Sequence, residues 1–368
     1  MKASIVIVVG VLALASGRAE AYPQFQMSFD QTCSGCHISP AGGGLLTENG
    51  MNTAETISAW GTNPEFLNGA FDMPAWLALG GDVRAMWGYL QAPQRYLLGF
   101  PMQADLYAAV KQKKITGVVT VGLRPAQDGN EALTRVWSRE HYVMWQSEEG
   151  AAEGIFLRAG HFMPVFGLRL VEHPAYTRRY GGTPLYSETY GVSASLVKAR
   201  LELHASGFVK NPIIDPVRQG SGGALYGELR VDEKTSIGAG GMIEVSDFDH
   251  KYRGTLTAKR YLEGKNLLLQ GELQFVNPHV GDYGYKQLVG NLMLTYFGPK
   301  GIVVDVAFNH FDGNLRIADL DRDAFDLNVH FFATSHIELM LVSRLELMAL
   351  GSGGPTGAYA FLQAHYRL

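Results

Sequence analysis

The 368-residue chain carries a formal net charge of −4, with 18% charged and 46% hydrophobic residues. A weakly acidic chain lacks the electrostatic footprint of a nucleic-acid-binding protein, so we expect no nucleic-acid partner. Its 44 glycines and 11% aromatic residues favour many short strands and turns over long helices. The length alone suggests two domains, although one large β-barrel also accounts for it.

The first 21 residues have the pattern of a secretory signal. Lys2 precedes a stretch over residues 4–16 that is almost wholly apolar or small, and Ala19-Glu20-Ala21 places small residues where a signal peptidase reads them. The stretch is too short to span a bilayer, and no later apolar run approaches the roughly 18–20 residues of a spanning helix. We therefore expect a mature chain that begins near Tyr22, in an oxidising compartment.

The segment 33–37 reads Cys-Ser-Gly-Cys-His and contains both cysteines of the chain. In this spacing two thiols add to the vinyl groups of a haem and the following His ligates the iron. The motif predicts one covalently bound haem c, attached through Cys33 and Cys36, with His37 as the proximal axial ligand. A disulfide, a redox-active dithiol or a zinc site are the alternatives; a dithiol usually needs a βαβ domain and zinc needs more ligands.

Residues 22–73 are too few to form an ordinary core of their own. A haem could serve as that core, with a short helical turn over 33–37, a second over 54–60, and breaks at Pro40 and the glycines at 42–44. The side chains expected to pack around it are Phe25, Phe29, Leu45, Leu46, Ile57 and Trp60. We expect the segment to dock in or below the mouth of the barrel described next.

The sixth haem ligand has three possible sources, because no second His occurs between residues 22 and 73. A local Met is the first, and Met51 is the favoured candidate because the flexible Asn49-Gly50 precedes it; a thioether ligand would raise the reduction potential. Met27 and Met73 are the other local candidates. The second source is an inward-facing His of the barrel, and the third is no sixth ligand at all. The barrel candidates are His204, His310, His330 and His365.

From residue 74 to the end, alternating runs of about ten residues are separated by turns. In 199–206, 267–276 and 325–332, apolar residues alternate with polar ones, which puts one face of each strand in an apolar medium and the other in a polar medium. The pattern predicts an all-β fold: an outer-membrane β-barrel of about 16 antiparallel strands. The predicted strands centre near residues 82, 106, 119, 140, 158, 191, 204, 227, 239, 256, 271, 291, 306, 328, 342 and 362.

Two further patterns favour a membrane barrel over a soluble β-sandwich. Short turns alternate with longer polar loops, as periplasmic turns alternate with outer loops in such barrels. The chain also ends on an alternating strand whose one face, from Ala358 to Leu368, resembles the terminal signal of bacterial barrel proteins. The domain prediction is a signal peptide over 1–21, a monohaem segment over 22–73 and a barrel over 74–368.

The segment 160–182 is too long for a tight turn and too apolar for a solvated loop. We expect it to fold back into the lumen, and a surface loop with a basic patch is the alternative. Arg169, Arg178 and Arg179 with Glu172 could form a constriction that selects ions by charge. The side chains that could instead approach the haem or a metal substrate are His161, His173, Tyr176 and Tyr180.

The whole layout resembles the fused cytochrome–porins of the bacterial outer membrane, best known from iron oxidisers. The specific matches lie between residues 21 and 50: Ala21-Tyr22-Pro23-x-Phe25, Cys33-x-x-Cys36-His37, Pro40 and Asn49-Gly50. The resemblance implies that Cys33 and Cys36 carry the haem thioethers, that His37 is the axial ligand, and that a barrel of about sixteen strands follows.

These patterns together predict an electron-transfer conduit in the outer membrane, with the haem segment on the periplasmic side or in the lumen. The expected partners are a periplasmic c-type cytochrome or other soluble carrier, an extracellular redox substrate, for which iron is the candidate, and outer-membrane lipid. Such a protein could act as an Fe(II) oxidase or a metal reductase. The alternative function is a diffusion porin whose haem segment is a redox-dependent plug.

Overall fold

The computed structural model describes residues 23–91, 94–124, 135–210, 220–281, 283–318, 320–348 and 355–368. The predicted signal peptide over 1–21 lies outside these ranges, as do residues 125–134, 211–219 and 349–354 of the longer connections. Among the described residues, no helix combines the length and the apolar composition needed to cross a bilayer.

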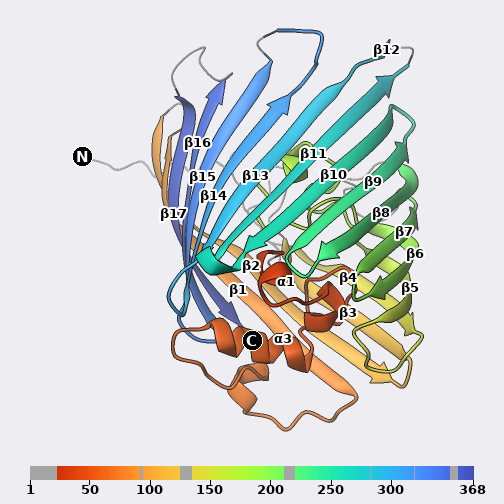
Figure 1. Cartoon of the computed structure of the whole chain (residues 1–368), viewed down its shortest axis with the longest axis vertical. Helices are drawn as coiled ribbons and strands as arrows, with labels where there is room; N and C mark the ends of the chain where they lie inside the picture. The colour runs from red at the N-terminus through yellow and green to blue at the C-terminus, as the bar shows by residue number, and fades with distance from the viewer. Residues whose placement is uncertain are drawn as a thin grey trace.

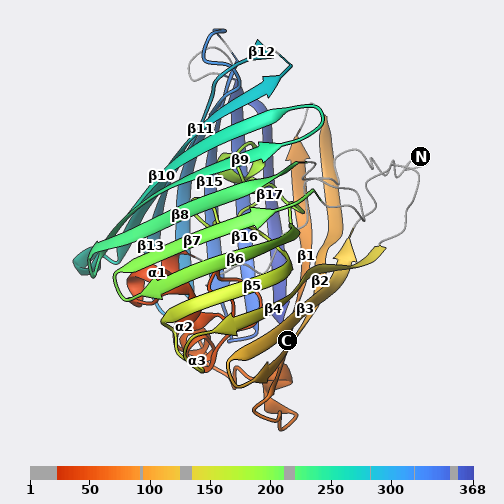
Figure 2. The same ribbon diagram turned by 90° about the vertical axis from the view of Figure 1, so that its right-hand side faces the viewer.

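The strands form a single closed antiparallel barrel (Figures 1 and 2). Their bounds are β1 Leu77–Gln91, β2 Arg95–Gln112, β3 Ile115–Arg124, β4 Arg135–Gln146, β5 Gly154–Phe162, β6 Thr189–Lys198, β7 Leu201–Phe208, β8 Ser221–Asp232, β9 Thr235–Val245, β10 His250–Leu262, β11 Leu267–Val280, β12 Tyr283–Gly284, β13 Gln287–Phe297, β14 Ile302–Asp312, β15 Asp321–Phe332, β16 Ile337–Met348 and β17 Pro355–Arg367. The two-residue β12 pairs only with the end of β11, which leaves sixteen long strands.

The barrel closes where the first strand meets the last. β1 pairs with β2 on one side and with β17 on the other, and Trp87 lies opposite Leu362 across the seam. The main-chain N–H of the terminal residue Leu368 donates to the carbonyl of Gly81, so the C-terminus is part of the hydrogen-bonded wall. A closed sheet leaves no free edge, and the soluble-sandwich alternative is therefore wrong. The predicted strand count is confirmed, and each predicted strand centre lies within one of the sixteen long strands.

The barrel is polar inside and apolar outside. In β7, Glu202 and His204 are buried toward the lumen, whereas Leu203 between them is 43% exposed. The same alternation runs along β11 and β15, whose buried polar side chains include Gln270, Glu272, Gln274, Asp326, Asn328 and His330. This arrangement reverses the one in a soluble protein and matches barrels whose outer face contacts lipid.

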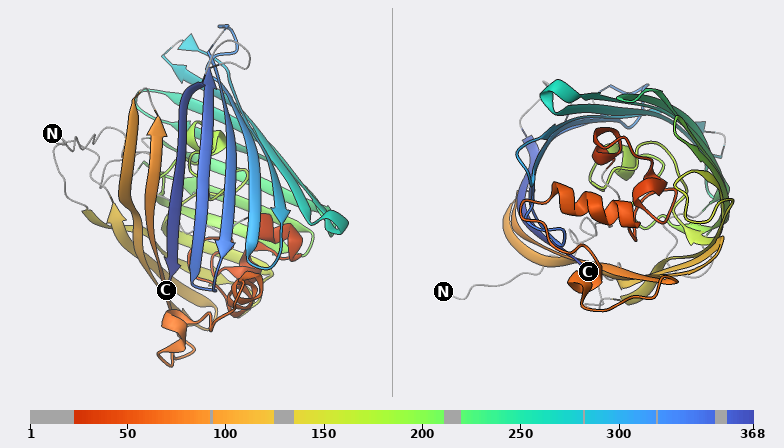
Figure 3. Two further views of the ribbon diagram at one scale, coloured as in Figure 1. Left: turned by 90° about the vertical axis from the view of Figure 1, so that its left-hand side faces the viewer. Right: turned by 60° about the horizontal axis from the view of Figure 1, so that its bottom comes forward.

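Short turns close the strands at one end of the barrel, at residues 113–114, 199–200, 233–234, 263–266, 298–301 and 333–336. The N-terminal segment lies at this same end. Its elements are α1 (Gln24–Ser28), α2 (Cys33–Cys36), α3 (Glu48–Ile57) and the 3₁₀ turn η2 (Phe66–Gly69). Figure 3 shows the three α-helices of the segment inside the ring of strands at this opening. This placement agrees with the expectation that the N-terminal segment docks in or below the barrel mouth.

The second helix of the segment differs from the prediction. The expected helix over 54–60 is instead α3, which begins six residues earlier and ends at Ile57. Its start is fixed by Thr47, whose hydroxyl accepts a hydrogen bond from the main-chain N–H of Gly50, as an N-cap residue does. Its end is fixed by Ser58, whose backbone is extended.

The long connection between β5 and β6 folds into the lumen, as expected, and the surface-loop alternative is wrong. It carries the short helix α4 (Tyr176–Arg179), and Leu170 is fully buried within it. The N–H of Tyr176 donates to Asn309 Oδ1 on β14, and Arg344 Nη1 of β16 donates to the carbonyl of Pro174. Wall side chains of β14 and β16 therefore hold this inward loop, residues 163–188.

Candidate functional site

The two cysteines are placed by a single helical turn. Thr32 caps α2, because its hydroxyl accepts a hydrogen bond from the N–H of Gly35 at 3.1 Å. The N–H of His37 donates to the carbonyl of Cys33 at 2.8 Å, and His37 itself leaves the helix with an extended backbone. The Cys-x-x-Cys-His segment is therefore a compact turn with its histidine at the exit. The predicted helical turn over 33–37 is confirmed.

A glycine turn brings the chain back beside His37. Gly42, Gly43 and Gly44 have φ angles of 81°, 78° and 61°, a region that residues with a Cβ atom rarely adopt. The returning chain forms an isolated bridge between His37 and Leu46. Three successive glycines are needed here because the chain must reverse within a few residues.

Helix α3 lies against the Cys-x-x-Cys-His segment. The N–H of Thr47 donates to the carbonyl of Cys36 at 3.0 Å, and its hydroxyl donates to the carbonyl of Gly35 at 2.7 Å. Asn49 Nδ2 lies 3.7 Å from Cys36 Sγ. These contacts fix the start of α3 beside the second thiol, so that the next turn of the helix borders the same space.

Cys33, Cys36 and His37 line one cavity of about 570 Å³ between the segment and the barrel wall. Pockets that hold a small molecule or cofactor have volumes of roughly 300–1,000 Å³. Four of the side chains expected to pack around a haem share this lining: Phe25, Leu45, Leu46 and Ile57. Of the six side chains expected to pack around a haem, Phe29 does not line the cavity, and Trp60 is 71% exposed and packs edge-on against Phe331 of the wall.

Burial sets the protonation states of the three residues. Desolvation raises the pKa of Cys33 to about 11 and raises the pKa of Cys36, so both thiols stay protonated at neutral pH. Desolvation, with the nearby charge of Arg367, lowers the pKa of His37 to about 4. The imidazole is therefore neutral, which is the form that ligates a metal. Its Nδ1 is buried and has no hydrogen-bond partner among the described residues.

The donor set fits a c-type haem. Two free thiols, a neutral imidazole and an apolar lining face one space of suitable size, and thioether bonds to the thiols with imidazole ligation of iron are the chemistry that this motif performs. Met51 and Met73 line the same cavity, whereas Met27 is fully buried in a cluster with Tyr261 and Leu268 of the wall. Of the three local candidates, Met27 is therefore committed to packing.

The barrel histidines proposed as sixth ligands are all hydrogen-bonded to carboxylates, and none lines the cavity. His204 contacts Glu202, and His310 contacts Asp323. The other two belong to a continuous buried chain of polar side chains along the wall. Its members, in order, are Asp305, His330, Glu338, His365 and Asp82, with successive distances of 3.0, 2.7, 2.9 and 2.6 Å.

Asp82 at the end of this chain also lines the cavity, beside Tyr107, whose hydroxyl donates to it at 2.6 Å. Sequence reasoning did not identify Asp82 or Glu338 as site residues. The signal was present, because both occupy lumen-facing positions of their strands, where a buried carboxylate must have a partner. The identity of that partner depends on which strands are neighbours.

The arginines of the inward loop are engaged by the surrounding structure. Arg169 pairs with Glu202 at 3.2 Å, and Arg179 lies 3.7 Å from Glu346. Arg178 donates to the carbonyls of Leu170 and Thr183 within the loop. Arg178 therefore holds the loop together, and a constriction that selects ions by charge stays a prediction. His161, His173, Tyr176 and Tyr180 do not line the cavity.

Several solved structures share this architecture. The anion-selective porin from Comamonas acidovorans superposes with a TM-score of 0.60 at 12% identity, covering 79% of this chain and 99% of the porin. The outer-membrane protein OmpT of Vibrio cholerae gives 0.56 at 10% identity, with 79% and 97% covered. The channel DcaP of Acinetobacter baumannii gives 0.54 at 13% identity, with 81% and 99% covered. No protein-family model and no curated protein matches the sequence. The chain therefore has the fold of porin-like outer-membrane β-barrels.

Proposed function

We propose that this protein carries one covalent haem c at the mouth of an outer-membrane barrel and transfers electrons between an external redox substrate and a soluble periplasmic carrier. The observation that carries the proposal is that Cys33, Cys36 and His37 line a single cavity of about 570 Å³. Cys33 and Cys36 would hold the haem through thioethers, His37 would be the axial ligand, and Met51 is the candidate sixth ligand. The haem would supply one-electron redox chemistry.

The chain's own contribution is to exclude water and to fix the position of the site. Phe25, Leu45 and Ile57 give the cavity an apolar lining. Gln26 Nε2 donates to Glu202 of β7 at 3.0 Å, and Arg230 of β8 pairs with Asp30 at 2.6 Å. These contacts support a haem segment that is anchored in the barrel rather than tethered below it.

The location of the segment suits exchange with a periplasmic cytochrome. It lies at the end of the barrel with the short turns, which in outer-membrane barrels faces the periplasm. A hydrocarbon core of about 30 Å separates the two compartments, so a redox centre within the barrel shortens the path to an external donor or acceptor. Iron is the candidate external couple, and the activity would then be that of an Fe(II) oxidase or a metal reductase.

A diffusion porin with a haem-bearing plug is the second candidate. The solved structures with this fold include an anion-selective porin, which favours passage of solutes. The segment and the inward loop would then act as a plug whose position depends on the redox state.

The haem is tested by a visible spectrum of the purified protein, oxidised against reduced, and by peroxidase staining of a denaturing gel. Cys36→Ser should abolish the covalent haem band. Ser34→Ala is the matched control, because it alters the same turn and keeps both thiols. A colourless wild-type protein, or a Cys36→Ser band equal to that of the control, would refute the assignment.

The two functions separate in liposomes that enclose a redox dye and a small labelled solute. A conduit reduces the dye when a donor is added outside and retains the solute, whereas a porin releases the solute. Vesicles carrying the Cys36→Ser protein give the baseline, since a haem-dependent path must disappear in them.

A further inference from the structure

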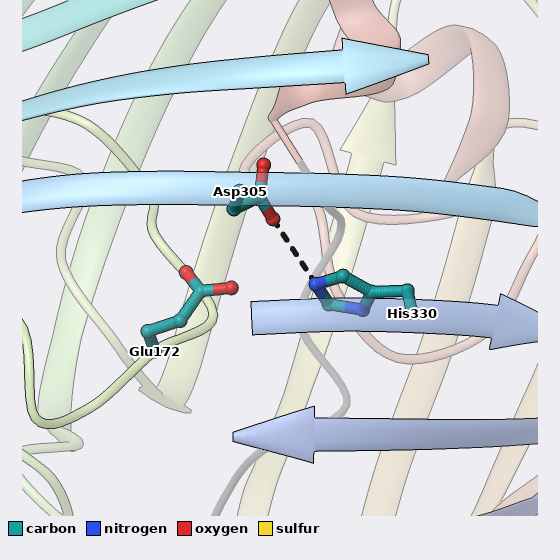
Figure 4. Close-up of side chains that lie close together, drawn as sticks. All are labelled: Glu172, Asp305 and His330. Atoms are coloured by element: carbon teal, nitrogen blue, oxygen red, sulfur yellow. Dashed lines mark hydrogen bonds and ion pairs between the residues drawn. The ribbon is translucent and has the colours of Figure 1, made fainter. Parts of the chain in front are cut away.

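Three potential metal ligands meet in the lumen, and none of them lines the cavity that Cys33, Cys36 and His37 share. The ligand atoms of Glu172, Asp305 and His330 all lie within 4.8 Å of one another. Asp305 on β14 and His330 on the neighbouring β15 are 0% and 1% exposed, and Glu172 approaches them from the inward loop (Figure 4). It is the only such group of three among the residues that the structure describes.

The carboxylate of Glu172 is buried without a partner. Neither of its oxygens is accessible to solvent, and neither accepts a hydrogen bond from another described residue. Figure 4 shows the carboxylate pointing toward Asp305 and His330. Burying an uncompensated carboxylate costs free energy, and the carboxylate of Glu172 faces a second one. A bound cation would compensate both charges.

His330 has the orientation of a metal-binding imidazole. Its Nδ1 lies 2.7 Å from Glu338 Oε1, and its Nε2 lies 3.0 Å from Asp305 Oδ2. A histidine that ligates a metal commonly donates its other ring N–H to a carboxylate, which fixes the tautomer and the ring orientation. Both ring nitrogens face a carboxylate oxygen, so the metal-free imidazole donates from Nδ1 to Glu338 and from Nε2 to Asp305. A cation bound by Nε2 and Asp305 would take the place of the Nε2 proton.

The position of Asp305 is also fixed by a hydrogen bond to its other carboxylate oxygen. Thr295 Oγ1 donates to its Oδ1, which leaves Oδ2 facing His330. The side-chain amide of Gln24, on α1, reaches this same Oδ2 at 3.2 Å. Gln24 is 1% exposed, and its Oε1 is buried without a partner among the described residues, so the N-terminal segment offers an additional oxygen beside the cluster.

We propose that Glu172, Asp305 and His330 bind one divalent first-row transition-metal cation. One imidazole with carboxylate oxygens suits Mn²⁺, Fe²⁺, Co²⁺ or Zn²⁺, whereas Mg²⁺ and Ca²⁺ prefer oxygen ligands alone. Glu172 belongs to the loop and the other two ligands belong to the wall, so the bound cation links the loop to the barrel. This proposal does not rest on the proposed electron transfer, because none of the three residues belongs to the haem segment.

The test uses Mn²⁺ as the probe and the metal-stripped full-length protein in detergent, without a histidine tag. Binding is measured by equilibrium dialysis and by loss of the free-Mn²⁺ paramagnetic resonance signal. We expect one Mn²⁺ per wild-type chain and an affinity at least ~10-fold lower for Glu172→Gln, a loss of the size seen when metal-site residues are replaced. No Mn²⁺ bound to the wild type, or equal affinity of the variant, would overturn the proposal.

Asp323→Asn is the matched control. Asp323 and His310 form a second His–Asp pair on the same two strands, at 2.9 Å, and in the described part of the chain no third ligand joins them at this spacing. Its Mn²⁺ affinity should equal that of the wild type. An equal loss in this control would mean that Mn²⁺ binds the lumen non-specifically and would count against the site.

A thermal melt distinguishes loss of the site from misfolding. Mn²⁺ should raise the Tm of the wild type, because a ligand that binds only the folded state stabilises it, and should leave Glu172→Gln unchanged. Without metal, Glu172→Gln should melt no lower than the wild type, since it removes a buried unpartnered charge. In the same titration, Cys36→Ser should still bind Mn²⁺. The metal site can therefore be tested separately from the haem assignment.

Discussion

Gly50 packs directly against Cys36: a Cβ atom at position 50 would lie 2.1 Å from the carbonyl oxygen of Cys36. Helix α3 can approach the Cys-x-x-Cys-His segment this closely only because residue 50 has no side chain. The contact places the next residue, Met51, on the same cavity as both thiols and His37. The absence of a side chain at Gly50 therefore allows Met51 to be part of the candidate site.

Gly50→Ala should destabilise the segment. The added methyl group gains about 1 kcal/mol of helix propensity, but overpacking against a rigid main-chain carbonyl costs about 1–3 kcal/mol. We expect the clash to dominate, so that the segment is digested faster by a protease added to the detergent-solubilised protein. Asn52→Ala, at an exposed position of the same helix, gains propensity without a clash. Equal protection of the two variants would mean that α3 does not lie on Cys36.

Met51→Leu tests the sixth ligand. If the Met51 thioether ligates the iron, its loss should remove the charge-transfer band at the red end of the oxidised spectrum and lower the reduction potential, because a thioether ligand raises it. Met27→Leu is the control, since Met27 packs against Tyr261 and Leu268 and a volume-conserving change there usually costs under about 1.5 kcal/mol. An unchanged potential in Met51→Leu excludes this residue and leaves Met73 as the local candidate.

Arg344 holds the inward loop against the wall. Its guanidinium donates to both carboxylate oxygens of Asp326, at 2.6 and 2.7 Å, and to the carbonyl of Pro174 at 2.6 Å. Arg344→Met removes the loop contact and leaves Asp326 without its cation, and breaking a buried pair in this way costs about 3–5 kcal/mol. The loop should loosen, and single-channel conductance in a planar bilayer should rise.

Arg253→Met is the matched control for that measurement. Arg253 also lies in the lumen, but its guanidinium donates to Glu244 and to the sulfur of Met242 on the neighbouring strand. It should lose comparable stability without a rise in conductance. If both variants conduct equally, the loop anchored by Arg344 does not control the path through the barrel.

The alternation of polar and apolar residues was sufficient to predict the barrel. In a closed antiparallel sheet each strand pairs with its neighbours in the sequence, so the topology follows once the strands are recognised. The inward loop was also predictable, because residues such as Leu168 and Leu170 are too apolar for solvent and are buried in the structure. The Cys-x-x-Cys-His motif identified the candidate haem residues through its spacing alone.

The contacts across the lumen were not predictable from the sequence. Gln24 and Asp305 are 281 residues apart, and their meeting depends on where the segment enters the ring of strands. The cluster of Glu172, Asp305 and His330 likewise combines a loop with two strands. The start of α3 differs from the predicted one for a local reason: Asn49 and Gly50 are poor helix formers, but the N-cap at Thr47 begins the helix before them.

The outward face of the barrel provides a test of the membrane itself. Leu225, on β8, is 65% exposed and lies between Ala205 and Gly241 of the neighbouring strands. If this face contacts hydrocarbon, Leu225→Arg should lower the free energy of unfolding in lipid vesicles by about 2–4 kcal/mol near the midplane. In water, a surface substitution of this kind changes stability by no more than about 0.5 kcal/mol. The loss of stability expected for Leu225→Arg is therefore severalfold larger if the residue faces lipid than if it faces water.

The matched change is Glu233→Arg, which introduces the same side chain at an exposed position of the β8–β9 turn, beyond the end of the strands. Urea titrations of both variants in vesicles, followed by tryptophan fluorescence, should separate them, with Leu225→Arg destabilised and Glu233→Arg close to the wild type. Equal stabilities would place Leu225 in water. The exposed apolar side chains of the wall would then need a protein partner rather than lipid to cover them, and a path for electrons across a bilayer would lose its structural basis.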